Sequence, residues 1–375
     1  MPALATEASA PGKLILMGEH AAVYGVPAVT ASVGLRTAAR VAPRPIGSSV
    51  ALELTDLGLR EELSWDGVLE YGERRRALWT EYQAAPSPER FSALRAGEEA
   101  GVVKIAMAET LRFLEREPAE AHREPLRLSV RSELPMGSGF GSSASVAVAV
   151  VAALVASLTS ESAPDPSTVA EVVLEAEKRQ HGQPSGVDHT TVLRGGFLFL
   201  TREDEGLKIE RLSRPSWFLP GVRVFDSGPP DQATGEVVAA VRELESRDSE
   251  AFATLLSRME GAVREFAAAL ACSEPAWPAV LGSVKAFERS LEALGVVPEP
   301  ARDAIVRIEA AGGAAKISGA GALSGRGAGS LIVFWPPGAD GDPRRILADY
   351  RPLDADLGSP GLEVRRHKES ESAGA

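Results

Sequence analysis

Alternating hydrophobic and polar positions predict several strands. Over residues 126–132, Leu126, Leu128 and Val130 alternate with polar side chains, which indicates a strand with one buried face. Shorter apolar stretches predict further strands at 14–17, 26–33, 191–193, 197–200, 222–225 and 331–335. The Ala- and Val-rich run 144–158 is shorter than the about 20 residues that a membrane span needs, so we expect a buried helix there.

Helical spacing of apolar residues predicts helices at 102–116, 234–244, 250–270 and 300–311, and one that begins near Thr168. Thr168 and Glu171 are spaced as in a capping box, and Gly182 predicts the end of that helix. Glu177 continues its apolar stripe, so the carboxylate is either partly exposed near the helix end or turned inward, where it needs a partner or a cation. Residues 52–100 give no clear pattern.

Strands and helices mix in both halves, which predicts an α+β protein. The pattern is lost over 202–216, so we expect two domains, residues 1–212 and residues 213–375, with a disordered tail after about 365. The first ten residues do not resemble a secretory signal, and we expect a cytoplasmic protein without a membrane partner.

Composition excludes several classes of function. Lys and Arg total 40 against 52 Asp and Glu, a net charge of −12 without a basic stripe, which argues against nucleic-acid binding. Cys272 is the single cysteine, so neither an internal disulfide nor a cysteine-based zinc site can form, and its Ala-rich surroundings predict a buried thiol.

The most informative segment is the glycine loop 137–143, Gly-Ser-Gly-Phe-Gly-Ser-Ser, between a predicted strand and a predicted helix. Such a loop can turn several N–H groups toward an anion at a helix N-terminus, and Ser142 or Ser143 could cap the helix or ligate Mg²⁺. A tight turn with a serine cap is the alternative. The spacing fits neither a Walker A loop nor a dinucleotide fingerprint, which disfavours a redox enzyme.

A second glycine-rich stretch, 316–330, is either a flexible loop or a second backbone wall near phosphate, with Lys316 or Arg326 adding charge. Asp188 follows a turn-rich loop and is either a turn residue or a base for a hydroxyl nucleophile. His20 is either a polar ligand contact or a surface histidine.

Three segments together resemble the motifs of the GHMP kinases: residues 10–25, residues 132–144 and residues 316–321. Glu177 followed by residues 181–188 is similar to the branch that phosphorylates mevalonate. The resemblance implies an N-terminal domain like ribosomal protein S5, a ferredoxin-like C-terminal domain, and the site between them. It also implies ATP-dependent phosphorylation of the 5-hydroxyl of mevalonate, a step in isoprenoid precursor synthesis.

The resemblance also implies residue roles. Asp188 would accept or orient the hydroxyl proton. Lys13 would stabilise Asp188 as a carboxylate and pair with the charge on the transferring phosphoryl group. Ser143 and Glu177 would ligate Mg²⁺. The remaining implied contacts are with ATP (Lys13, Asp56, Ser132, Gly137, Ser138, Gly139, Phe140, Gly141, Ser142 and Ser143) and with mevalonate (Glu19, His20 and Thr234).

Three features depart from the family pattern. Residues 322–328 interrupt the third motif, Gln232 replaces a basic residue two positions before Thr234, and His189 replaces an Asn after Asp188. Another GHMP kinase, such as one acting on phosphomevalonate, and a non-catalytic ligand sensor on the same fold are the alternatives. The sequence leaves the oligomeric state open, with a homodimer as one alternative.

Overall fold

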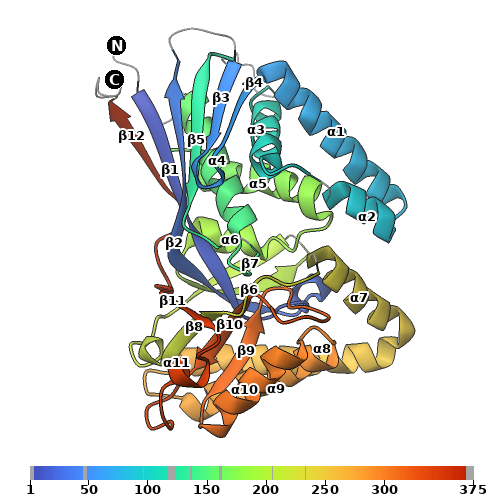
Figure 1. Ribbon diagram of the computed structural model, residues 1–375, viewed down its shortest axis with the longest axis vertical. Coiled ribbons are helices and arrows are strands. Elements are labelled where there is room, and N and C mark those ends of the chain that lie inside the picture. Colours follow the sequence, from blue (N-terminus) through green and yellow to red (C-terminus); the bar gives the residue numbers. More distant parts are fainter. Residues whose placement is uncertain are drawn as a thin grey trace.

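The computed structural model describes residues 4–44, 49–95, 97–115, 123–135, 137–159, 163–204, 206–232 and 234–368. Two sheets, each with helices packed against it, form its upper and lower parts (Figure 1). Within these ranges, no helix is long and apolar enough to cross a membrane. Helices and strands occur in both halves, as the mixed pattern predicts.

The larger sheet has eight strands in the order β12-β1-β2-β5-β3-β4, and β6 joins β2 to β7. Neighbours are antiparallel except β3 and β5, which run parallel. The bounds are β1 (Leu4–Met17), β2 (Ala28–Pro43), β3 (Ser49–Leu54), β4 (Leu59–Ser64), β5 (Leu126–Ser132), β6 (Phe197–Glu203), β7 (Gly206–Leu212) and β12 (Glu363–Lys368). In β5 the apolar positions are buried and the alternate arginines are exposed, as the alternation predicts.

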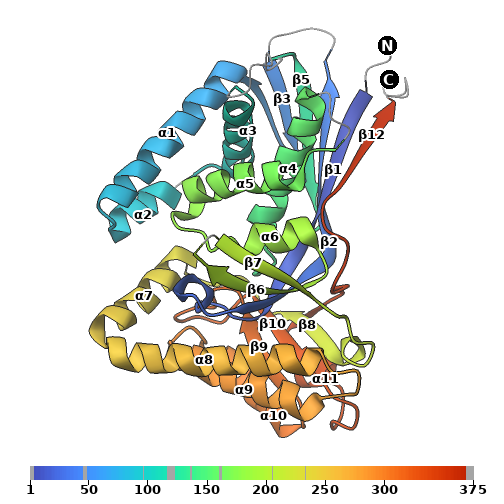
Figure 2. The same ribbon diagram turned by 180° about the vertical axis from the view of Figure 1, so that it is seen from behind.

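Helices cover one face of this sheet (Figure 2). The apolar helix α4 (Ser142–Leu158) lies against β1 and β2 and is buried over most of its length, so the predicted buried helix is confirmed. Around it pack α1 (Trp65–Ala84), α2 (Pro88–Arg95), α3 (Gly101–Leu114), α5 (Pro166–His181) and α6 (Val187–Arg194). The short helices η1 (Ala22–Tyr24) and η2 (Thr55–Leu57) lie in connections.

The smaller sheet has the antiparallel order β11-β8-β10-β9. Its strands are β8 (Val222–Asp226), β9 (Ala314–Ser318), β10 (Ser330–Phe334) and β11 (Arg351–Leu353). Its helices are η3 (Leu219–Gly221), α7 (Thr234–Arg247), α8 (Ser249–Leu270), α9 (Trp277–Ala293), α10 (Glu299–Ala310) and α11 (Pro343–Ile346). Helices α9 and α10 pack on β9, and α8 packs on α9.

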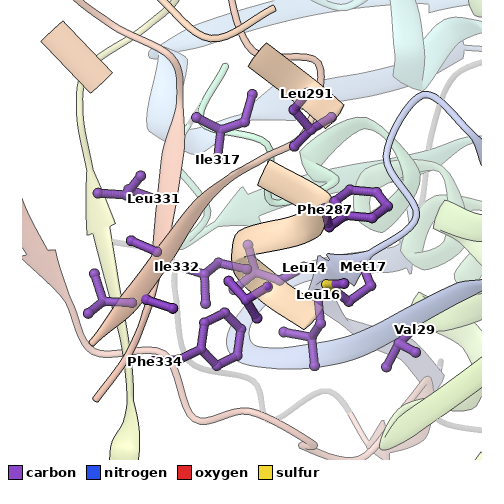
Figure 3. Packing of buried hydrophobic residues seen from close by; sticks show 14 of the residues in the cluster. Leu14, Leu16, Met17, Val29, Phe287, Leu291, Ile317, Leu331, Ile332 and Phe334 are labelled. Carbon is purple, nitrogen blue, oxygen red and sulfur yellow. The ribbon is translucent and has the colours of Figure 1, made fainter. Parts of the chain in front are cut away.

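A shared core joins the two parts. Leu14, Leu16 and Met17 of β1 belong to the same buried cluster as Phe287 of α9 and Ile317 of β9 (Figure 3). The last strand, β12, returns to the larger sheet and pairs with β1. The shared core fixes the end of β1 against β9, and the proposed site lies at this junction. The division between residues 212 and 213 stays a prediction.

Four sequence predictions are wrong in detail. Residues 191–193 lie in α6 and not in a strand, because a short apolar run does not distinguish the two. Thr168 is not the cap of α5, since Pro166 begins the helix and Asp165 occupies the cap position. Cys272 is exposed, because α8 ends before it. The predicted disorder after about 365 is wrong as far as Lys368, and residues 369–375 lie outside the described ranges.

Candidate active site

The glycine loop 137–141 connects the end of β5 with the start of α4. Gly137, Gly139 and Gly141 all have positive φ angles, of 74°, 81° and 67°. This alternation coils the backbone in a way that side chains with a Cβ rarely allow. No side chain caps the N-terminus of α4, so the N–H groups of its first turn are available to an anion.

The loop is fastened to both sheets. The Lys13 N–H of β1 donates to the Phe140 carbonyl at 2.9 Å. The buried Ser138 hydroxyl donates to Asp226 at the end of β8, at 3.3 Å, and Ser330 of β10 donates to the Ser138 carbonyl. A Cβ on Gly139 would come within 2.6 Å of the Ser318 carbonyl oxygen. The start of the third glycine motif therefore packs directly on the phosphate-type loop, as a second wall would.

Lys13 and Asp188 meet beside this loop. Lys13 Nζ lies 2.9 Å from Asp188 Oδ1; the lysine side chain is 4% exposed and the aspartate side chain is 40% exposed. The lysine stem packs against Gly141, where a Cβ would come within 2.7 Å of Lys13 Cγ. Asp188 lies in the first turn of α6, so the pair presents a partly exposed carboxylate next to a held cation.

Ser143 of α4 contacts Gln180 on the side of α5 that also carries Glu177. The Ser143 hydroxyl donates to Gln180 Oε1 at 2.6 Å, and Gln180 lies one helical turn after Glu177. The buried Glu177 carboxylate contacts His189 Nδ1 at 2.8 Å. Burial alone would lower the pKa of His189, but Glu177 and Asp188 outweigh burial and raise it. The inward orientation of Glu177 that its stripe position suggests is confirmed.

The end of β1 supplies Glu19 and His20. His20 has a φ of 58°, a left-handed conformation that is strained for a non-glycine residue. Its Nε2 lies 2.9 Å from the Ala320 carbonyl oxygen, and burial lowers its pKa. Glu19 is buried against Lys316 Nζ, which also donates to the Ile317 carbonyl at 2.5 Å. Burial raises the pKa of Glu19, and Lys316 opposes this shift. The Lys316 side chain is fully buried. It therefore neutralises Glu19 and does not add positive charge to the surface of the glycine-rich loop.

Gln232 fastens the interrupted third motif. Its amide nitrogen donates to Ser324 Oγ at 2.8 Å, and its amide oxygen accepts from the N–H groups of Leu323 at 3.1 Å and Ser324 at 3.4 Å. Nearby, Ser227 Oγ accepts from the Ala328 N–H at 2.8 Å. The inserted residues are therefore attached to the segment that leads into α7.

The other predicted residues lie farther apart. Asp56, in η2, accepts from the Ser132 N–H at the end of β5, because β3 and β5 pair in parallel. Thr234 is exposed at the first residue of α7. Ser142 is the first residue of α4 and is half-buried.

The sequence prediction missed contacts that join distant segments. Gln180 could have been found from its position one turn after Glu177, whereas nothing in the local pattern pairs Glu19 with Lys316, 297 residues away. The sequence identifies His189 and Gln232 only as departures from the family pattern and does not predict their contacts. Arg95, at the end of α2, lies in a segment without a clear sequence pattern.

A phosphate-type loop, a lysine–carboxylate pair and a buried glutamate on the helix that contacts Ser143 together indicate a kinase for small molecules. Residues 102–196 match the family model described as GHMP kinases N terminal domain. A mevalonate kinase of Pyrococcus furiosus is 30% identical over 377 residues, covering 95% of this chain and 97% of that protein. The chain therefore belongs to the GHMP kinase family.

Within that family the similarity is to mevalonate kinases. The Mus musculus mevalonate kinase is 30% identical over 363 residues, covering 88% of this chain and 86% of that protein. A solved structure of a mevalonate kinase shares the fold with a TM-score of 0.70 at 19% identity, covering 94% of this chain and 98% of that one. The expected α+β, two-domain GHMP kinase fold is confirmed.

Proposed function

We propose that this protein transfers the γ-phosphoryl group of ATP to the 5-hydroxyl of mevalonate. The observation that carries the proposal is the 2.9 Å contact between Lys13 and Asp188 beside the glycine loop. In phosphoryl transfer, a carboxylate orients the acceptor hydroxyl and a cation lies beside the transferring phosphoryl group. The two side chains of this pair could fill these two roles. The two relatives named above are mevalonate kinases, and this chain matches 97% and 86% of their lengths. This similarity supports mevalonate as the acceptor.

In this proposal Asp188 orients the acceptor hydroxyl and takes its proton. Its 40% exposure leaves one side of the carboxylate open to a substrate. Lys13 keeps that carboxylate in place and lies where negative charge develops on the transferring group. Phosphoryl transfer requires little covalent chemistry from the protein, so positioning and electrostatic stabilisation carry much of the rate.

The donor set fits ATP with Mg²⁺. Loop 137–141 and the uncapped start of α4 offer backbone N–H groups to phosphates. Ser143 Oγ and Glu177 would hold the metal. Over the described residues no cluster of three His, Cys, Asp or Glu side chains could bind a metal ion, and Mg²⁺ ordinarily takes its other ligands from phosphates and water. Bound Mg²⁺ would neutralise phosphate charge, and Asp56 and Ser132 would lie near the nucleotide.

Mevalonate would lie between the end of β1 and the start of α7. His20, kept neutral by burial at physiological pH, and Thr234 would contact it. Glu19 would act through its buried pair with Lys316, which fixes the backbone before His20. We assign His20 and Thr234 to direct contact and Glu19 to support.

A coupled ADP-release assay tests the proposal. Purified protein with ATP and Mg²⁺ is given mevalonate, phosphomevalonate, galactose, homoserine or no acceptor. ADP release that depends on mevalonate alone is the expected result. Turnover with another acceptor would contradict the substrate assignment and leave the phosphoryl-transfer site in place. ATP binding without turnover on any acceptor would contradict the proposal and favour a ligand sensor.

A further inference from the structure

Arg95 is a half-buried cation at the last residue of α2. Its guanidinium makes no hydrogen bond and no ion pair with another residue in the described part of the chain. A guanidinium keeps its charge in a protein, and its five N–H groups form a planar fork that suits a carboxylate or a phosphate. A cation that is partly desolvated without a partner points to an anionic ligand.

The surroundings place Arg95 at the rim of the proposed site. Arg75 donates to the carbonyl of Leu94 and, at 3.1 Å, to that of Arg179, which brings the end of α2 to the end of α5. One turn earlier, Phe91 covers Gly235 in the first turn of α7. The end of α2 is thus held between α5 and the start of α7, where the upper and lower parts meet (Figures 1 and 2).

Electrostatic interactions connect Arg95 with the catalytic pair. Burial chiefly lowers the pKa of His181; Glu177 and Asp188 oppose this shift, and Arg95 and Lys13 add to it. His181 therefore lies within reach of both Arg95 and the Lys13–Asp188 pair. Burial lowers the pKa of Arg95, and Glu236, next to Thr234 and Gly235 in α7, opposes this shift.

The cations of the family motifs and of the inserted loop 322–328 are engaged or exposed. Lys13 contacts Asp188, and Lys316 is buried with Glu19. Position 232 is a neutral Gln whose amide is bonded to the inserted loop. Arg326 lies exposed on that loop. We propose that Arg95 binds the carboxylate of the acceptor substrate, opposite the hydroxyl that Asp188 orients. This inference rests on the proposed function and assigns the anionic end of its substrate.

The test compares acceptors with and without the carboxylate. Arg95→Gln and Arg95→Lys are assayed with mevalonate and with 3-methylpentane-1,3,5-triol, in which a hydroxymethyl group replaces the carboxylate. Arg95→Gln should lower kcat/KM for mevalonate by about 10- to 100-fold, mainly through KM, and leave the KM for ATP and kcat/KM for the triol unchanged. Arg95→Lys should recover part of the loss. Arg90→Gln, exposed on the same helix, is the matched control and should behave as wild type.

Three outcomes would overturn the assignment. An equal loss on both acceptors would show a structural role for Arg95, and a raised KM for ATP alone would assign it to the nucleotide. A selective loss in Arg326→Gln with normal Arg95→Gln would transfer the role to the inserted loop. Inactivity of the wild-type protein toward mevalonate would instead contradict the proposed function itself, so the two failures are distinguishable.

Discussion

Two side chains in contact, Lys13 of β1 and Asp188 of α6, have the central roles in the proposed phosphoryl transfer. Asp188→Asn keeps the size of the side chain and removes its ability to take a proton. We expect kcat to fall by about 100- to 10,000-fold with unchanged ATP affinity. The ADP-release assay and calorimetric titration with ATP measure the two effects. Asp303→Asn, exposed on α10, is the control; a near-normal rate for Asp188→Asn would remove Asp188 from proton transfer.

A substitution of Glu177 tests its proposed role as a Mg²⁺ ligand. Glu177→Gln removes the charge while the amide keeps the shape that fits beside His189 and Gln180. The Mg²⁺ concentration for half-maximal rate should rise by about tenfold or more, because a hard cation prefers a charged oxygen ligand. A Mg²⁺ titration at saturating ATP measures it, with Glu171→Gln on the exposed side of α5 as the control. An unchanged Mg²⁺ requirement would exclude Glu177 as a ligand.

Lys13 and Asp188 meet in the structure, as their motifs imply, whereas the partners of Ser143, Glu177 and Glu19 came from the structure alone. Lys13 and Asp188 each occupy a motif that could be read locally, and they meet in the fold. The position of Gln180 one turn after Glu177 could have been read from the sequence, but its bond to Ser143 and the contact of His189 with Glu177 could not, because side-chain hydrogen bonds between helices leave no periodic signal. The buried role of Lys316 was also beyond prediction, since its glycine-rich surroundings resemble a phosphate loop.

At the scale of elements, two loops press against each other at Gly139. A Cβ there would come within 2.6 Å of the Ser318 carbonyl, and φ is already +81°. Gly139→Ala should therefore raise the KM for ATP several-fold and lower the Tm. Gly338→Ala is the matched control, because Gly338 has a φ of +91° with nothing within 4 Å of its Cβ position. It should cost only about 1 kcal/mol of left-handed strain and leave ATP binding unchanged. Equal effects on ATP binding would contradict loop contact as the cause.

Glu288 on α9 predicts a pH dependence of stability. Burial raises its pKa from the ordinary value of 4.5 to about 8, with Lys316 opposing. Between these values the folded protein holds a proton that the unfolded chain releases. The free energy of unfolding should therefore fall as pH rises from about 5 to 8, by up to about 1.4 kcal/mol per pH unit relative to Glu288→Gln, which does not titrate. Urea unfolding across this range measures it.

The control for Glu288 is Glu265→Gln, exposed on α8, which should follow the wild-type pH profile. Parallel profiles for wild type and Glu288→Gln would show that Glu288 is ionised in the folded protein. The amide oxygen of Gln can still accept from the Ile317 N–H, as Glu288 Oε2 does at 3.3 Å, so loss of that bond would not account for a difference.

Helices and strands with a regular hydrophobic pattern could be predicted from the sequence. Those that depend on contacts with neighbouring elements could not. Strand β5 and helices α4 and α8 follow their hydrophobic patterns closely. Residues 52–100 gave no pattern because α1 and α2 are mostly polar and half-exposed, and because contacts with α3 and α5 hold them in place. The length of β1 was also missed, since its first half is small and polar and pairs on both sides with β2 and β12.

The contacts between the upper and lower parts of the molecule include two that bear on the proposed acceptor position. On one side the end of β1 shares the core around Phe287 and Ile317 (Figure 3). On the other side, α2 meets α7 where Phe91 covers Gly235, and Arg242 donates to Tyr82 at 3.1 Å. In the proposed function the acceptor lies between these two contacts, near Asp188, His20 and Thr234. The proposal therefore predicts that acceptor binding depends on how closely α2 approaches α7.

Gly235→Ala tests that dependence. In a helix this change ordinarily stabilises by about 1 kcal/mol, but here the added methyl group would overlap the Phe91 ring. We expect a lower Tm and a several-fold higher KM for mevalonate with little change in the KM for ATP, because the hydrogen bonds described for the glycine loop go to β1, β8 and β10 and not to α7. Gly261→Ala in α8, with nothing within 4 Å, should instead raise stability. Phe91→Ala should restore KM in the Gly235→Ala background, because it removes the overlapping ring. Failure of that rescue would show that Gly235 acts within α7 and not through its contact with α2.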